Sequence, residues 1–549
     1  MNLSPFLERK FGLHFLRAVI LSLFVTSCNT AGVTRPSYHV TPESNWMNDP
    51  QRPFFLGGEW HMYYLYNADF NEANPRAGGG TEWYHVTSTD LVSWTRRGVA
   101  IEKYKPNQNG VYLGDIETGS AVIDTENTAG FGRNAVITLA TQMQGGIQQQ
   151  SLFYSTDNGY KFTPFSGNPV MPNPNPSAKA DFRDPKVIWD AAHSIWIMAL
   201  AEGNKIGFYS SSNLKTWAYR SGFIPQDSGV DLGLLECPDL YQLDVDGDPS
   251  KRTWVLAAGA NGYRFNRPTG TAYWIGSWDG IRFTTANVLP QWMDSGADFY
   301  ATVSWSDPRL TGNKIYTSRY AIGWMNNWDY ANDLPYNGVW AGQLSVVRDI
   351  KLKTIGGAVR LVNSPIASYA TTFDTGYNVT GKTITTNPAT ASLPAMAGGA
   401  YMIRTVVSKK SGDDGNEVRI KIKGDGTFAT TVGFDFANTR AFLVRDNDGT
   451  ATDSIAEAPK RAYDAVRTAS VPMEGNSVIL TVYVDWNSVE VFVNDGVATL
   501  SGLLYPNSGA ETIQIVSGSG RLTLDSFSYA SARSMQPKRK QTRRSRKAT

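Results

Sequence analysis

The segment STDLVSW at residues 88–94 returns in similar form as STDNG at 155–159, SSNLKTW at 211–217 and SWDG at 277–280. The first serines of successive copies are 67, 56 and 66 residues apart. Each copy separates two hydrophobic runs, as a turn at the same place in successive four-stranded sheets would. Dividing a region of roughly 315 residues by roughly 63 residues per copy predicts a β-propeller of about five blades. Coincidence is the competing interpretation, because Ser-x-Asp turns are common.

The sequence around these copies predicts an all-β protein of two domains. Short alternating runs, such as residues 60–66 and 196–200, are broken by Gly, Pro, Asn and Asp, and long helical periodicity is absent. A second region of about ten short strands with frequent turns is typical of a β-sandwich. We therefore expect an N-terminal five-bladed propeller and a C-terminal β-sandwich. The expected boundaries are 36–352 for the propeller, 353–366 for a linker and 367–532 for the sandwich.

The N-terminal segment resembles an export signal, and the C-terminal segment is strongly basic. Arg9 and Lys10 precede an apolar run followed by small residues, which predicts a cleaved signal peptide at 1–32 and a secreted protein without a membrane span. The residues VTSC at 25–28 also resemble a bacterial lipoprotein cleavage box, so a lipid anchor at Cys28 stays open. The basic segment at 533–549 is expected to be a disordered tail.

Charge and cysteine content narrow the classes of partner. The formal charge is +2, but residues 538–547 carry seven positive charges and the first 28 residues a net +2, which leaves −7 for the rest. Such a body has no basic face suited to nucleic acid. The five histidines show no ligand spacing and the chain has only two cysteines, so we expect no metal, no cofactor and no intramolecular disulfide. The oligomeric state stays open.

Three acids have unusual settings. Asp49 lies in WMNDP at 46–50, Asp184 in FRDP at 182–185 and Glu236 in ECPD at 236–239, each with proline close behind and apolar residues nearby. A single acid before proline is more often a turn. On the repeat map, however, the three fall in blades one, three and four, where equivalent strands converge on the propeller axis. Two carboxylates that face one glycosidic bond are the apparatus of glycoside hydrolysis, and a partly buried acid can hold a proton near neutral pH.

The three acid motifs together resemble the signatures of glycoside hydrolase family 32, which includes invertases, inulinases, levanases and fructosyltransferases. The resemblance covers almost the whole chain after the signal. The other segments that carry it are WYHV at 83–86, TGSAV at 118–122, GWMNNW at 323–328 and DWNSVEVFVNDG at 485–496.

The resemblance implies a role for each acid in a retaining β-fructofuranosidase. Asp49 would be the nucleophile, Glu236 the acid/base, and Asp184 the stabiliser of the transition state. The products would be fructose or short fructo-oligosaccharides. The residues expected to line the fructose pocket are Asn48, Asn67, Trp83, Ser120, Arg183 and Trp324.

Departures from the family pattern bear on the substrate. Gln51-Arg52 follows the first motif, Asn67 stands where many members have Gln, and Glu117-Thr118 replaces the usual Phe-Ser. The surrounding residues look closer to the levan-acting branch, so we expect levan to be preferred over inulin and sucrose. Aromatic platforms near the pocket mouth would favour a polymer. The residues expected to supply them are Tyr84, Trp324, Trp328, Tyr330 and Tyr336.

Other functions stay open at this point. The same site could belong to a fructosyltransferase or to an invertase that acts mainly on sucrose. A catalytically inactive fructan-binding protein and an inverting arabinose-type glycosidase are disfavoured by the intact acid motifs. The sandwich is expected to be structural or to form a rim of the substrate cleft, without a catalytic acid, and Asp485 and Glu490 are expected to be solvated carboxylates.

Overall fold

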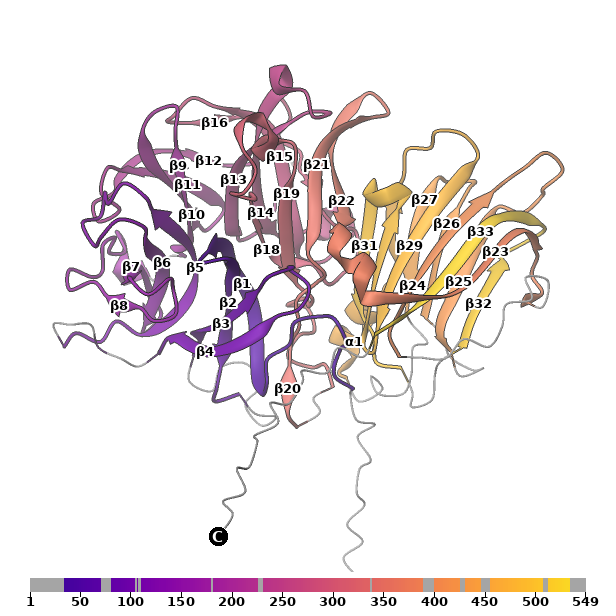
Figure 1. Ribbon diagram of the computed structural model, residues 1–549, viewed down its shortest axis with the longest axis horizontal. Coiled ribbons are helices and arrows are strands. Elements are labelled where there is room, and N and C mark those ends of the chain that lie inside the picture. The colour runs from indigo at the N-terminus through magenta and orange to yellow at the C-terminus, as the bar shows by residue number, and fades with distance from the viewer. Residues whose placement is uncertain are drawn as a thin grey trace, which may run out of the picture.

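The computed structural model describes residues 34–70, 80–103, 106, 110–178, 181–225, 231–335, 338–388, 399–424, 430–445, 455–506 and 512–533. The predicted signal peptide at 1–32, with Cys28, lies outside these residues, as do Tyr336 and all of the basic tail after residue 533. Among the described residues, no helix has the length and apolar character needed to cross a bilayer. The protein is almost entirely β, with an N-terminal propeller beside a C-terminal sandwich (Figure 1).

Five antiparallel sheets of four or five strands follow one another between residues 45 and 365. The first is closed by a short parallel strand from far along the chain, β20 (Trp340–Ala341), which pairs with β1. In chain order the sheets comprise β1 (Asn45–Leu56), β2 (Glu59–Asn67), β3 (Glu82–Ser88) and β4 (Thr95–Ile101); β5 (Asp115–Asp124), β6 (Ala135–Gln144), β7 (Ile147–Ser155) and β8 (Thr163–Pro164); β9 (Arg183–Asp190), β10 (Ile195–Glu202), β11 (Lys205–Ser211) and β12 (Ala218–Phe223); β13 (Glu236–Asp244), β14 (Arg252–Ala260), β15 (Gly270–Trp278), β16 (Phe283–Thr284) and β17 (Gln291–Trp292); and β18 (Tyr300–Trp305), β19 (Arg319–Trp324), β21 (Arg348–Ile355) and β22 (Ala358–Pro365).

The repeated serine segment is the turn after the third strand of each of the first four sheets. Ser88, Ser155 and Ser211 end β3, β7 and β11, and Ser277 is the penultimate residue of β15. In the first copy the Ser88 hydroxyl accepts from the backbone N–H groups of Asp90 and Leu91, at 3.2 and 2.8 Å. These side-chain bonds satisfy the turn locally, which is why the motif recurs at one structural position.

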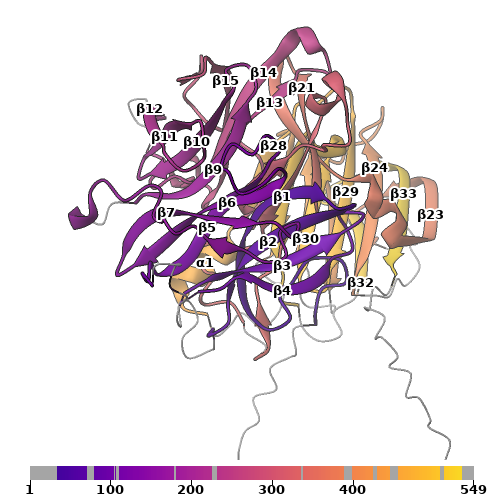
Figure 2. The ribbon, with the colours of Figure 1, turned by 60° about the vertical axis from the view of Figure 1, so that its left-hand side comes forward.

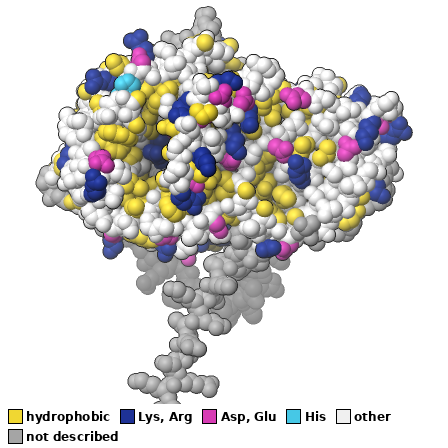
Figure 3. All heavy atoms as spheres, turned by 45° about the horizontal axis from the view of Figure 1, so that its top comes forward, with side chains coloured by type: hydrophobic (Ala, Val, Ile, Leu, Met, Phe, Trp, Pro, Cys, Tyr) yellow, Lys and Arg dark blue, Asp and Glu magenta, His cyan; other side chains and the backbone are white. Residues whose placement is uncertain are grey.

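The first strands of the five sheets, β1, β5, β9, β13 and β18, lie innermost and contact one another around the propeller axis. Figure 1 looks roughly along this axis, and Figure 2 shows the same sheets from the side. On the propeller face seen in Figure 3, hydrophobic side chains surround a hollow that contains Lys or Arg atoms.

The sandwich packs two antiparallel sheets over a core of buried aliphatic and aromatic side chains. One sheet comprises β23 (Phe373–Ile384), β33 (Leu522–Ala532), β24 (Tyr401–Ser408), β29 (Ser477–Asp485), β30 (Ser488–Val493) and β31 (Ala498–Leu503). The other comprises β28 (Arg467–Ser470), β27 (Arg440–Val444), β26 (Thr430–Asp435), β25 (Glu417–Gly424) and β32 (Thr512–Ser517). In the part of the chain that the structure describes, the helices are α1 (Glu457–Asp464) and the short 3-10 helices η1 (Pro176–Ala178), η2 (Pro249–Lys251), η3 (Tyr263–Phe265), η4 (Gly312–Tyr316), η5 (Ala367–Thr372) and η8 (Asn494–Gly496).

The linker expected at 353–366 is wrong for most of its length. Residues 358–365 form β22, which pairs along its whole length with β21 and completes the fifth propeller sheet. The Gly356-Gly357 turn of this hairpin, with φ of 57° and 78°, resembles a flexible connection in sequence. The connection between the domains is therefore shorter and includes η5.

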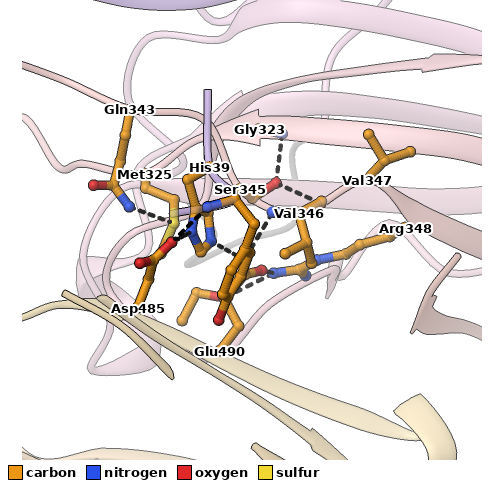
Figure 4. Close-up of polar contacts among 12 residues, drawn as sticks. His39, Gly323, Met325, Gln343, Ser345, Val346, Val347, Arg348, Asp485 and Glu490 are labelled. Atoms are coloured by element: carbon orange, nitrogen blue, oxygen red, sulfur yellow. Dashed lines mark hydrogen bonds and ion pairs between the residues drawn. The ribbon is translucent and has the colours of Figure 1, made fainter. Parts of the chain in front are cut away.

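The two domains meet through buried charged groups. His39 lies between two sandwich carboxylates, with Nδ1 2.8 Å from Asp485 Oδ2 and Nε2 3.0 Å from Glu490 Oε1 (Figure 4). Arg348 of β21 donates to Glu490 Oε2 at 2.7 Å and to Asp294 Oδ2 at 2.9 Å. The expectation that Asp485 and Glu490 are solvated is wrong, since both are fully buried. Their partners come from the propeller, so the local strand–turn pattern could not reveal their burial.

Candidate active site

The three acids singled out from the sequence meet at one end of the propeller axis. Asp49 lies near the start of β1, Asp184 is the second residue of β9, and Glu236 is the first residue of β13. These are the inner strands of the first, third and fourth sheets, as the repeat map predicted.

Each of the five inner strands has a β-bulge at this end. The two bulged residues are Asn48-Asp49 in β1, Glu117-Thr118 in β5, Asp184-Pro185 in β9, Cys237-Pro238 in β13 and Ala301-Thr302 in β18, and each pair lies opposite a single residue of the second strand. Three of these residues have left-handed backbone conformations, with φ of 62° at Asp184, 46° at Cys237 and 48° at Ala301. Bulges redirect side chains and are common beside active sites. Here they turn the side chains at the strand starts out of the regular alternation.

Asp49 is held by hydrogen bonds to both of its carboxylate oxygens. Thr118 Oγ1 donates to Oδ2 at 2.6 Å, and Asn48 Nδ2 donates to Oδ1 at 3.0 Å. Gln51 fixes the backbone beneath it, since its amide donates to the Asp49 carbonyl and accepts from the Gly119 N–H. The carboxylate therefore has a fixed orientation.

Cys237 lies between Asp49 and Asp184. Its backbone N–H donates to Asp184 Oδ2 at 2.9 Å, and its Sγ lies 3.6 Å from Asp49 Oδ2 and 3.7 Å from Asp184 Oδ2. Glu236, the preceding residue, accepts from Arg183 Nη2 at 3.0 Å and from the Tyr300 hydroxyl at 2.6 Å. Arg183 also pairs with Asp181. A single network of contacts thus joins all three acids.

Burial and neighbouring charges raise the pKa of two of the three acids. Burial raises the pKa of Asp49, and the negative charge of Glu236 adds to the rise, against the hydrogen bonds from Thr118 and Asn48. Burial likewise raises the pKa of Asp184, although the Arg183 guanidinium opposes it. Carboxylates crowded in one pocket cannot all ionise freely, and their summed negative potential would stabilise positive charge on a bound molecule.

A fourth carboxyl belongs to the same cluster. Burial raises the pKa of Glu117 to about 7, with further rises from the charges of Asp115, Asp184 and Asp49. The Glu117 carbonyl accepts from Trp83 Nε1 at 2.9 Å. Sequence reasoning noted Glu117 and Thr118 only as departures from a family pattern, and it gave no role to Cys237. Tyr300 had no recognisable signal at all.

The predicted pocket residues lie at different distances from the acids. Asn48 and Arg183 contact them directly, and Trp83 bonds to the neighbouring Glu117. Ser120 instead braces β5 against β9, because its hydroxyl donates to the Pro185 carbonyl and accepts from the Val187 N–H.

Asn67 and Trp324 lie deeper. Both are fully buried, and Asn67 Oδ1 accepts from the Asp69 N–H. Trp324 packs against Trp46 and Trp328 in the core between sheets.

The expected aromatic platforms are only partly at the surface. Tyr84 and Trp328 are partly exposed, whereas Trp324 is fully buried in a strand. The expectation that Tyr330 is a platform at the pocket mouth is wrong. Tyr330 is fully buried, and its hydroxyl donates to Asp298 Oδ1 and accepts from Arg445 of the sandwich. An exposed aromatic that the sequence argument missed is Tyr263 in η3, which is 57% exposed and donates to Asp329 just beyond Trp328.

Comparison with known proteins agrees with this architecture. The family model "Glycosyl hydrolases family 32 N-terminal domain" matches residues 39–365, and "Glycosyl hydrolases family 32 C terminal" matches residues 370–531. The chain is 40% identical over 497 residues to a levanbiose-producing levanase of Bacillus subtilis, covering 88% of each chain. It is 49% identical over 322 residues to a levanbiose-producing levanase of Geobacillus stearothermophilus, covering 58% of this chain and 76% of the relative.

A solved structure extends the likeness to three dimensions. The crystal structure of an exo-inulinase from Aspergillus awamori superposes with a TM-score of 0.78 at 29% identity, covering 91% of this chain and 98% of the inulinase. Matches of both family domains and of the whole fold lead to one conclusion. The chain belongs to glycosyl hydrolase family 32 and is a glycoside hydrolase of the β-fructofuranosidase type.

Proposed function

We propose that this protein hydrolyses fructan by a retaining mechanism, with levan preferred over inulin and sucrose. The observation that carries the chemistry is the single cluster of Asp49, Asp184 and Glu236, drawn from three sheets. Levanases at 40 and 49% identity and an exo-inulinase of Aspergillus ficuum at 30% identity support a fructan as the substrate.

In this proposal Asp49 is the nucleophile. Its carboxylate attacks the anomeric carbon of the fructosyl unit while Glu236 gives its proton to the leaving oxygen, so the glycosidic bond breaks as the bond to Asp49 forms. Water then attacks the fructosyl–Asp49 ester, and Glu236 takes the proton from that water. The bonds from Thr118 and Asn48 suit the nucleophile, because they hold its oxygens in place before reaction.

Asp184 and the residues around Glu236 have supporting roles. Asp184 is bound by the Cys237 N–H and would face the developing positive charge of the fructosyl ring. Tyr300 and Arg183 orient the Glu236 carboxyl from its two oxygens. The exposed Tyr263 offers an apolar ring face, on which a sugar beyond the scissile bond could stack with a gain on the order of 1 kcal/mol.

The test compares kcat/KM on levan, inulin and sucrose at one pH and temperature. We expect levan to be the best substrate, and sucrose equal to or better than levan would defeat the levan assignment while leaving fructoside hydrolysis intact. Proton NMR of the first product should show the anomer of the substrate, and the opposite anomer would exclude retention. Incubation with concentrated sucrose distinguishes a transferase, which would form oligomers longer than the input.

A further inference from the structure

A second cluster of charged side chains lies along the same axis, deeper than the acids. Its basic members are Arg52 of β1, Lys186 of β9 and Arg319 of β19, and its acidic member is Asp239 of β13. Arg52, Lys186 and Asp239 follow the acids Asp49, Asp184 and Glu236 on the same strands by two or three residues, which is roughly 7–10 Å along a strand. Arg319 begins β19, so the cluster lies toward the turns that join first strands to second strands.

The deep members of the cluster are firmly fixed. Lys186 Nζ lies 2.9 Å from Asp239 Oδ1, and Asp239 Oδ2 accepts from the Ser304 hydroxyl at 2.6 Å. Arg319 donates through Nε to the same hydroxyl at 3.1 Å and through Nη1 to Ser306 at 2.6 Å. Lys186 and Arg319 are buried, at 4% and 7% exposure.

Arg52 reaches the axis from a second bulge of β1. Arg52 and Pro53 together lie opposite one residue of β2, and Arg52 Nη1 donates to the Val187 carbonyl of β9 at 3.1 Å. The side chain is partly exposed. Nε and Nη2 of Arg52 and Nη2 of Arg319 have no hydrogen-bond partner among the described residues, so these N–H groups are available to a ligand.

The protein compensates the charge of this cluster only in part: the Arg319 guanidinium lies over the Tyr241 ring at 4.6 Å, and Lys186 Nζ donates to the Ser304 carbonyl at 3.3 Å. Three cations share the single carboxylate of Asp239. Burial and the charges of Arg52 and Arg319 lower the pKa of Lys186 to about 8 despite Asp239, and burial and Arg319 lower the pKa of Arg52 to about 10. Three cations beside one carboxylate create a positive potential that favours an anion.

We propose that Arg52, Arg319 and Lys186 form a binding site for a small oxyanion of the phosphate or sulfate class on the propeller axis. Arginine presents planar pairs of N–H donors that match two oxygens of such an anion, and lysine adds a point charge. Fructans are uncharged, so this ligand is distinct from the substrate and the site stands independently of the proposed function.

The test is calorimetric titration of the full-length protein with inorganic phosphate at pH 7, with sodium chloride adjusted to hold ionic strength constant. We expect saturable binding at one site per chain with a Kd below about 1 mM. Arg52→Gln should weaken binding by at least about tenfold, since loss of one charge-assisted hydrogen bond has an effect of that order. Arg133→Gln is the matched control, because Arg133 pairs only with Glu126 and both are 66% exposed at their side chains.

The outcomes decide the proposal in either direction. Absence of saturable heat with phosphate and with sulfate, or equal affinity in wild type and Arg52→Gln, would overturn it. If Arg52→Gln does not fold, Arg52→Lys keeps the charge and removes the paired N–H donors. Binding at least several-fold weaker in Arg52→Lys supports the site, and unchanged affinity refutes it.

Discussion

Replacing Glu490 by glutamine should test how the two domains are held together. Glu490 Oε1 accepts from His39 Nε2 at 3.0 Å and from the Val346 N–H at 2.8 Å, and Oε2 accepts from Arg348 at 2.7 Å. Glutamine has the same shape but one oxygen fewer. Its NH₂ group must therefore face either Arg348 or the pair of Val346 and His39, all of which are donors.

The magnitude follows from burial. Glu490 and Arg348 are both fully buried, so the substitution leaves Arg348 with only Asp294 as a charged partner. Breaking a buried ion pair by removal of one partner costs about 3–5 kcal/mol. For a folded body of roughly 500 residues the unfolding entropy is about 1 kcal/mol/K, so we expect a fall in Tm of about 3–5 °C.

Calorimetric unfolding and steady-state kinetics together form the assay. Glu490 lies in the domain interface and makes no contact with the three acids, so kcat on levan should stay near wild type while Tm falls. Glu126→Gln is the control, because its ion pair with Arg133 is exposed and should contribute little. An unchanged Tm would refute the buried clamp, and a loss of kcat approaching that of Asp49→Ala would show that the chemistry is misplaced.

The remaining predictions concern pH and catalysis. Burial alone would lower the pKa of His39, but its bonds to Asp485 and Glu490 raise this pKa to about 9. Binding of the proton therefore stabilises the folded state by about 3 kcal/mol below pH 6.5, and this stabilisation is lost as the pH rises through 9. His39→Gln should therefore flatten the fall in Tm between pH 6.5 and 9, and an undiminished slope in calorimetry would contradict this. Because the pKa of Glu117 is raised to about 7, this carboxyl is neutral over the acidic limb of kcat/KM and becomes negative only above about pH 7. Glu117→Gln should therefore leave the acidic limb in place and change the profile only above about pH 7, and an acidic limb that moves would contradict this protonation state. Glu236→Ala should lower kcat on levan by about 10²–10⁴-fold but have a much smaller effect on a fructoside with an activated leaving group, and equal losses on both would reject its role as the acid.

The propeller was predictable because its repeated signal is local. The Ser88 hydroxyl and its counterparts bond to backbone N–H groups within a few residues, so the same short pattern recurs wherever the same turn recurs. The fifth sheet turns instead at Gly356-Gly357 after its third strand and lacks the motif. A hairpin with such a turn therefore has the sequence pattern of a linker.

The buried interface was not predictable for the opposite reason. His39 and Asp485 are 446 residues apart, and Arg348 and Glu490 are 142 apart. Asp485 and Glu490 flank a strand turn, and a carboxylate in that setting is usually solvated. Only the docking of the sandwich against the propeller supplies the cations that make their burial tolerable.

The prolines beside the three acids, which make these acids recognisable in the sequence, have a structural explanation. Asp49, Asp184 and Cys237 are each followed by proline, and each belongs to a bulge of an inner strand. Proline has no N–H to donate, so it is tolerated where a bulge interrupts the ladder and at the edge of a sheet, where β9 and β13 lie. The proline therefore marks a bulge that contains Asp49 in β1 and Asp184 in β9 and that directly follows Glu236 in β13, and the bulge redirects side chains out of the regular alternation.

The same reasoning explains what was missed. The bulges of β5 and β18, at Glu117-Thr118 and Ala301-Thr302, contain no proline. No local proline pattern therefore indicates these two bulges in the sequence. Yet Thr118 bonds to Asp49, and Tyr300, next to the second bulge, bonds to Glu236. All five inner strands have a bulge at this end, so the site is a ring in which two of the five bulges lack a proline that would mark them. Deletion of either Glu117 or Thr118 would replace the bulge of β5 by regular strand pairing. This change should misalign the ring and abolish turnover even though all three acids remain.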